Sequence, residues 1–172
     1  MRIKLLFLAC FLFTGLLCSC GTKSNTPIDS NAASTPTNNI SQSNPYFVLF
    51  EQIFADDPGL NTDIKYIAVD LAGAMQEDST EFLELMKAFC EDSGYTLLED
   101  NVKGLEEKGL IKDSFFEEGV VISFEDTSLT EKKLVTNASK WRSGLGAIGG
   151  AYTLTNQSGV WSITDIENQW VS

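Results

Sequence analysis

Residues 151–166 read AYTLTNQSGVWSITDI, a stretch in which two short β-type segments flank a polar connection. In the second segment, VWSIT, apolar residues alternate with hydroxyl-bearing ones, which is typical of a strand with one face in water. The connection, residues 156–159 (NQSG), is rich in residues that favour tight turns. The sequence therefore predicts a hairpin with strands at residues 151–155 and 160–166.

Two more strands are predicted upstream of this hairpin, at residues 120–124 (VVISF) and 133–142. In most of the chain from residue 45 to 118, apolar side chains instead recur at helical spacing. A run of helices followed by a run of strands predicts an α+β domain, with N-terminal helices packed on a C-terminal antiparallel sheet. Helices on a curved antiparallel sheet resemble the cystatin and NTF2-like architectures.

Local signals mark where the helices begin and end. Asn44 followed by Pro45 combines an N-cap residue with proline at the first helical position. Asp78 with Glu81 resembles a capping box, and Gly94 can close the helix that follows. Helices are predicted at residues 45–56, 79–92 and 101–108, and short strands at residues 65–71 and 95–98.

A winged-helix-like shape is the alternative fold. Residues 105–111 (LEEKGLI) resemble the end of a recognition helix, which closes at Gly109 before a β wing. However, Glu106 and Glu107 lie where a DNA-reading helix carries Arg and Lys for phosphate contacts. No nucleic acid partner is therefore expected.

The N-terminus has the architecture of an export signal. A short positive segment precedes an almost wholly apolar run at residues 5–17, which is shorter than the roughly 20 residues that span a bilayer. Residues 17–20 (LCSC) resemble the lipobox of bacterial lipoproteins, with small residues before an obligatory cysteine. The resemblance implies cleavage between Ser19 and Cys20 and lipidation of Cys20, with fatty acyl chains such as palmitate.

The chain after the anchor changes composition. Residues 21–44 are dominated by Ser, Thr and Asn and contain no aromatic residue, so they cannot offset the entropy cost of ordering. Such a tether reaches about 25–30 Å. We expect a signal peptide at residues 1–19, a lipidated disordered tether at 20–44 and a single globular domain at 45–172, held outside the cytoplasm on the cell membrane or outer membrane.

The composition excludes several classes of function. The net charge is −12, and loss of the two cations Arg2 and Lys4 with the signal leaves −14, which argues against nucleic acid or anionic lipid as partners. The acidic surface can be explained by solubility alone, and the alternative explanation is that it binds a cationic ligand. The absence of histidine excludes Ser-His-Asp and Cys-His catalysis and His-ligated zinc.

Cysteine and carboxylate patterns predict neither a metal nor a cofactor. Cys90 is the one cysteine left outside the signal and the anchor, and it falls on the apolar face of a predicted helix, which indicates a core position. The acidic residues at 56–63 lack the spacing of an EF-hand calcium loop.

One loop is a candidate ligand site. Residues 144–149 (GLGAIG) match G-x-G-x-x-G, but a strand follows rather than a helix, so we expect a glycine-rich turn or bulge instead of a dinucleotide site. Trp141 and Arg142 stand directly before it. With the backbone N–H groups around Gly144 and Gly146, they form a loop suited to an anion, a carboxylate or a sugar edge. The alternative places Trp141 in the core with the other two tryptophans.

These observations favour a non-catalytic lipoprotein module that binds a small ligand or an envelope protein of unknown specificity. The runner-up is a carboxylate-dependent hydrolase of the cell envelope, which requires two acidic side chains facing each other across a cleft. The protein is expected to meet the membrane through its lipid anchor.

Overall fold

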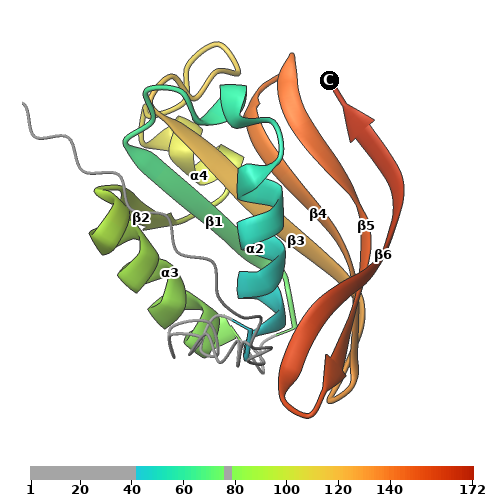
Figure 1. Cartoon of the computed structure of the whole chain (residues 1–172). Coiled ribbons are helices and arrows are strands. Elements are labelled where there is room, and N and C mark those ends of the chain that lie inside the picture. The colour runs from blue at the N-terminus through green and yellow to red at the C-terminus, as the bar shows by residue number, and fades with distance from the viewer. Residues whose placement is uncertain (1–41, 76–78) are drawn as a thin grey trace, which may run out of the picture. The chain divides into compact units, whose positions relative to one another are not determined.

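The structure is a computed structural model that describes residues 42–75 and 79–172. Figure 1 shows the helices and strands of this part of the chain. They are α2 (Pro45–Ala55), the 3-10 helix η1 (Pro58–Asn61), β1 (Tyr66–Gly73), α3 (Ser79–Ser93), β2 (Thr96–Glu99), α4 (Val102–Glu107), β3 (Gly119–Thr130), β4 (Lys133–Ser143), β5 (Gly146–Gln157) and β6 (Val160–Val171). No helix among the described residues is long and apolar enough to cross a bilayer.

The strands form a six-stranded mixed sheet of order β2-β1-β3-β4-β5-β6, which confirms the α+β class. The strands from β3 to β6 pair antiparallel, as predicted. Contrary to expectation, the sheet is not wholly antiparallel, because β1 pairs parallel with both β2 and β3. Crossovers through α3 and α4 return the chain in the same direction, which a hairpin cannot do. This parallel edge departs from the cystatin-like and NTF2-like expectation.

The winged-helix alternative is wrong. The helix that resembled a recognition helix, α4, has only six residues. It precedes a strand of twelve residues, β3, at the centre of the sheet, where a winged-helix domain has a small β wing.

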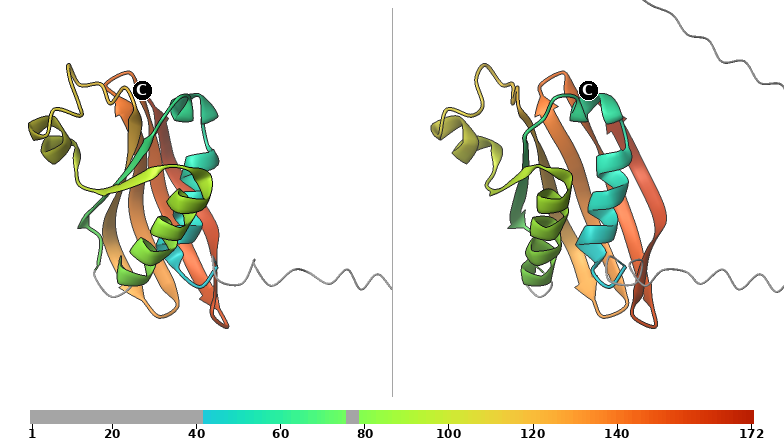
Figure 2. Two further views of the ribbon diagram at one scale, coloured as in Figure 1. Left: turned by 90° about the vertical axis from the view of Figure 1, so that its left-hand side faces the viewer. Right: turned by 60° about the vertical axis from the view of Figure 1, so that its left-hand side comes forward.

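The main core lies between α2, α3 and one face of the sheet (Figures 1 and 2). α2 begins as predicted, because the Asn44 side chain accepts hydrogen bonds from the backbone N–H groups of Tyr46 and Phe47 at 3.1 and 3.2 Å. Cys90 lies in this core, as predicted, with 1% of its surface exposed. The capping role predicted for Asp78 falls outside the described residues.

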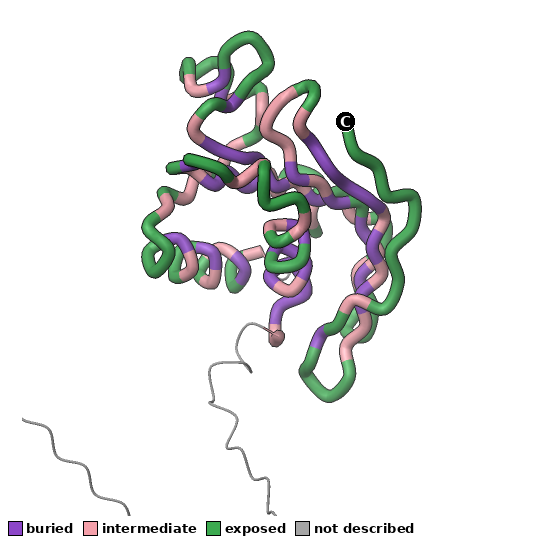
Figure 3. Tube along the Cα trace, turned by 45° about the horizontal axis from the view of Figure 1, so that its top comes forward, coloured by how far each residue is buried: buried purple, intermediate pink, exposed green. Residues whose placement is uncertain are grey.

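The opposite face of the sheet is covered at one end only. There α4 and the loop that follows it pack on β1 and β3, through a small cluster of Ala68, Leu105, Ile111, Phe116 and Val121. Figure 2 shows α4 on the side of the sheet away from α2 and α3. In Figure 3 the last strand, β6, is exposed along most of its length. None of the described helices covers the remainder of this face.

The glycine-rich stretch is mainly strand. The two-residue turn between β4 and β5 is Gly144-Leu145, and β5 already begins at Gly146. Pairing with β4 on one side and β6 on the other supplies this segment with hydrogen bonds that local propensity does not predict. The NQSG turn is confirmed: Ser158 and Gly159 take the positive φ angles, 57° and 85°, of a tight hairpin turn.

Candidate functional site

The four residues of the predicted ligand loop lie together at one hairpin end. Trp141 and Arg142 lie in the last three residues of β4, Gly144 lies in the turn and Gly146 begins β5. Trp141 is half-buried and packs against the small cluster beneath α4. The loop residue Leu145 is 92% exposed.

The guanidinium group of Arg142 is occupied by backbone carbonyl groups. Nη1 donates to the carbonyl oxygens of Leu60 and Thr62 at 3.0 and 2.8 Å, and Nη2 donates to that of Glu117 at 2.6 Å. The guanidinium also lies 5.6 Å from the ring centre of Phe115. Arg142 thereby ties the segment after η1 and the loop before β3 to the end of β4. A ligand role for this loop stays a prediction.

A groove of about 410 Å³ lies nearby, on the uncovered part of the same sheet face. Adjacent residues of a strand point to opposite faces, so Ile122 and Phe124 enter the main core while Ser123 and Glu125 face the groove. The groove is lined by Ser123, Glu125, Asn137, Ala138, Ser139, Gly150, Ala151, Asn168 and Trp170.

Strand register arranges the residues of this sheet face in two rows across four strands, of which Gly149 and Glu167 are not among the residues that line the groove. The first row runs Ser123, Ser139, Gly149 and Trp170, each paired with the next. The second row runs Glu125, Asn137, Ala151 and Glu167. Each row places its smallest residue on β5. The centre of the groove is therefore low, with polar side chains on β3 and β4 to one side and β6 on the other.

Trp170 forms the wall of the groove on β6. A Cβ atom added at Gly149 would come within 2.6 Å of Trp170 Cζ2, so the indole ring lies directly over this glycine. Trp170 is 46% exposed, which corrects its predicted place in the core beside Trp141 and Trp161; Trp161 is buried, at 5%. Because an indole has an apolar face and a polar N–H, an exposed tryptophan beside polar groups is a typical binding element.

The polar lining offers both donors and acceptors of hydrogen bonds. The hydroxyl groups of Ser123 and Ser139 lie 2.7 Å apart and bond to each other. Asn137 adds an amide, and Glu125 is the one charged side chain among the described residues that line the groove. A glycosidase-type pair of carboxylates is therefore not provided by this lining.

On the other face of the sheet, the buried cation of Lys140 joins β4 to the end of α2 and to η1. Lys140 has none of its surface exposed, and its ammonium donates to the carbonyl oxygens of Phe54 and Asp57 at 3.1 Å each and to Asn61 Oδ1 at 3.2 Å. The carbonyl oxygen of Asp56 is a further partner. These acceptors lie at the C-terminus of α2 and in η1, where a positive charge is favourable. Burial lowers the pKa of Lys140 to about 8, although Asp57 and Asp56 oppose the shift.

Sequence reasoning missed both the groove and the buried lysine. A partial signal for the groove was present, because Ser123 stands between two apolar residues on one strand, and Asn137 and Ser139 stand on either side of Ala138 on the next. In the part of the chain that the structure describes, no three His, Cys, Asp or Glu residues are grouped as metal ligands.

Comparison of the chain with models of protein families, with curated proteins and with solved structures finds no match.

Proposed function

We propose that the protein is a lipid-anchored, extracytoplasmic and non-catalytic binding module, whose binding surface is the groove beside Trp170. The single observation that carries the binding role is this open, polar groove with a half-exposed tryptophan on one wall. The lipobox ending at Cys20 supports the anchor.

The groove fits binding better than hydrolysis. General acid–base hydrolysis of glycosidic bonds uses two carboxyl groups on opposite sides of the bond. The described lining supplies the carboxyl group of Glu125 alone, between an amide and two hydroxyl groups. The glycine and alanine of the floor leave space without adding a reactive group. Orientation by several hydrogen bonds and one apolar wall is the usual chemistry of a binding site.

A cysteine reporter placed in the groove tests the proposal on intact cells. The native Cys90 is silent in this assay, because it is 1% exposed and burial raises the pKa of its thiol to about 11. Ala151→Cys puts a thiol on the groove floor. Its reaction with a small methanethiosulfonate reagent is timed on cells and on the purified full chain in detergent.

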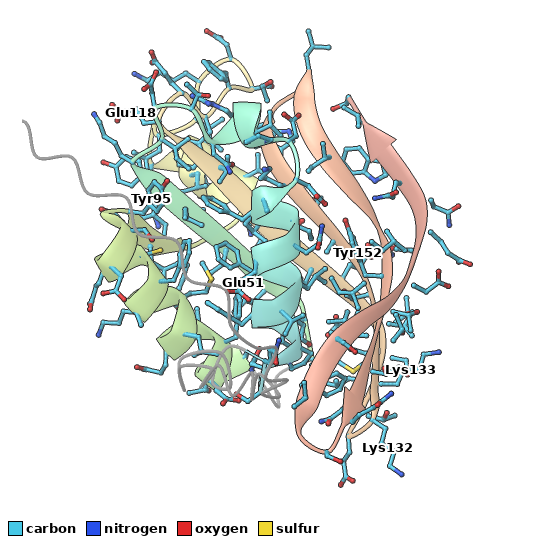
Figure 4. All side chains as sticks on the ribbon, viewed as in Figure 1. Glu51, Tyr95, Glu118, Lys132, Lys133 and Tyr152 are labelled. Atoms are coloured by element: carbon cyan, nitrogen blue, oxygen red, sulfur yellow. The ribbon has the colours of Figure 1, made fainter. Side chains whose placement is uncertain are left out.

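The matched control is Lys132→Cys, in the turn between β3 and β4, where Figure 4 shows the side chain at the end of the domain. If the groove is occupied in the envelope, the thiol at position 151 reacts more slowly on cells than in detergent, while the control reacts equally in both. Equal rates at position 151 would reject the groove as the binding surface.

A further inference from the structure

We infer that the ligand of this groove is a neutral saccharide, whose ring stacks on the indole of Trp170. This inference rests on the proposed function and names the chemical class of its ligand. It follows from the charge of the groove, from the shape of its floor and from the spacing of its polar groups.

Charge excludes an anionic ligand. The described lining contains Glu125 and no lysine or arginine, and the whole chain carries a net charge of −12. A phosphate or carboxylate ligand would be desolvated beside a carboxylate without a compensating cation. A cation would have Glu125 as its counter-charge. However, proteins recognise quaternary ammonium groups with a cage of several aromatic side chains, and the described lining of this groove has a single aromatic wall. A neutral polar ligand needs neither.

The floor and the wall fit a flat ring. Gly150 and Ala151 line the floor on β5, and β5 pairs with β6, which carries Trp170. The indole covers Gly149 on one side and is 46% exposed, so part of its surface is available to a ligand. The C–H groups on the face of a sugar ring are apolar and pack on an indole as other apolar surface does.

The polar groups fit the rim of hydroxyl groups on a sugar. Asn137 can donate and accept, Glu125 accepts, and the bonded pair of Ser123 and Ser139 retains further hydrogen-bonding capacity. All four come from the adjacent strands β3 and β4, so they lie on one side of the floor, away from the aromatic wall. This separation of a polar edge from an apolar face matches the two kinds of surface of a pyranose ring. A second copy of the chain fits less well, because it would bring a second Glu125 to the same open face.

Calorimetric titration of the purified full chain tests the inference. The probes are chitotetraose and maltotetraose as neutral saccharides, trilysine as a cation and inorganic phosphate as an anion. We expect a neutral saccharide to bind, and Trp170→Ala to weaken it by at least about tenfold, equivalent to about 1.4 kcal/mol. Val171→Ala is the matched control, because Val171 is the next residue, is 77% exposed and points to the other face of β6. It should leave the affinity unchanged.

The alternative outcomes are separable. Binding of trilysine or phosphate alone, with the same dependence on Trp170, would overturn the saccharide and keep the groove as a binding surface. If no probe binds but Ala151→Cys is labelled slowly on cells, the saccharide is likewise overturned and the groove is kept as a binding surface. If sedimentation shows a dimer that Trp170→Ala dissociates, the groove is a contact between copies, and the saccharide is rejected. Fast labelling at position 151 on cells would reject the proposed function itself.

Discussion

The indole ring of Trp170 lies over Gly149 on the neighbouring strand, so closely that a Cβ atom at position 149 would approach Cζ2 to 2.6 Å and Cε2 to 2.8 Å. A glycine is needed here for space rather than for backbone conformation. Cross-strand contacts between glycine and an aromatic ring also help to fix register in sheets. The contact therefore serves both the pairing of β5 with β6 and the wall of the groove.

Substitution of Gly149 should displace this wall. Gly149→Ala is expected to lower the free energy of unfolding by about 1–3 kcal/mol, as overpacking does, and to shift the indole N–H resonance of Trp170. Gly144→Ala is the control: a Cβ there meets nothing within 4 Å, and the change should stay within about 0.5 kcal/mol. Denaturant unfolding and NMR measure the two effects, and an unmoved Trp170 resonance would contradict the described contact.

Removal of the buried ammonium of Lys140 should lower the free energy of unfolding more than Gly149→Ala does. Lys140→Met keeps the apolar stem but leaves the carbonyl oxygen of Asp56 and the amide oxygen of Asn61 without their donor, whereas the carbonyl oxygens of Phe54 and Asp57 keep Asn61 Nδ2 and the Leu60 N–H. Buried acceptors without partners cost about 1–3 kcal/mol each, so we expect a loss of about 3 kcal/mol in denaturant unfolding. Lys132→Met, in an exposed turn, should change stability little. Equal effects of the two substitutions would rule out the ammonium as the link between α2 and β4.

The stability of the domain should depend on pH through Lys140. Its folded pKa is lowered to about 8 from 10.5, so between these values the unfolded chain binds more protons than the folded chain. The Lys140 contribution to the free energy of unfolding therefore rises from pH 8 to pH 10.5. Cys90 and Tyr152 have raised pKa values and act in the opposite sense. The contribution is isolated as the difference between the native chain and Lys140→Met; a difference that falls with pH would contradict it.

Arg142 should not tolerate lysine. Its two terminal nitrogens contact three carbonyl groups from two separate segments, at 2.6–3.0 Å. A lysine ammonium is a single point with a different reach and cannot reproduce this fork. We expect Arg142→Lys to destabilise the domain by about 1–3 kcal/mol and to leave saccharide affinity intact. Loss of binding without loss of stability would instead assign Arg142 to a ligand site.

Local signals in the sequence located the helices well. Asn44 and Pro45 define the start of α2, because capping and the fixed φ of proline act within a few residues. The strand β5 was predicted too short, at its glycines, because its hydrogen bonds come from both neighbouring strands. The parallel edge of the sheet also depends on contacts between distant segments, as does its strand order.

The site residues were harder to predict for the same reason. The charge of Lys140 favours a solvent-exposed position, yet its side chain is buried on the sheet face that carries Leu134 and Ala138, because carbonyl groups about 80 residues earlier in the chain accept its hydrogen bonds. Trp170 is a large apolar residue of the kind expected in the core, but it lies on the edge strand β6 and is half-exposed. Arg142 was correctly placed beside the turn, but its three carbonyl partners come from residues 60, 62 and 117.

A tether at Cys20 that holds the chain outside the cytoplasm is the central premise of the proposed function, because only there does the domain meet a ligand of the cell envelope. Mass spectrometry of the mature N-terminus, from the membrane fraction of cells that express the full chain, measures it directly. We predict an N-terminal peptide that begins with acylated Cys20. A Cys20→Ser variant should not be processed in this way. A mature chain that retains residues 1–19, or one that begins with an unmodified residue, would contradict the lipid anchor.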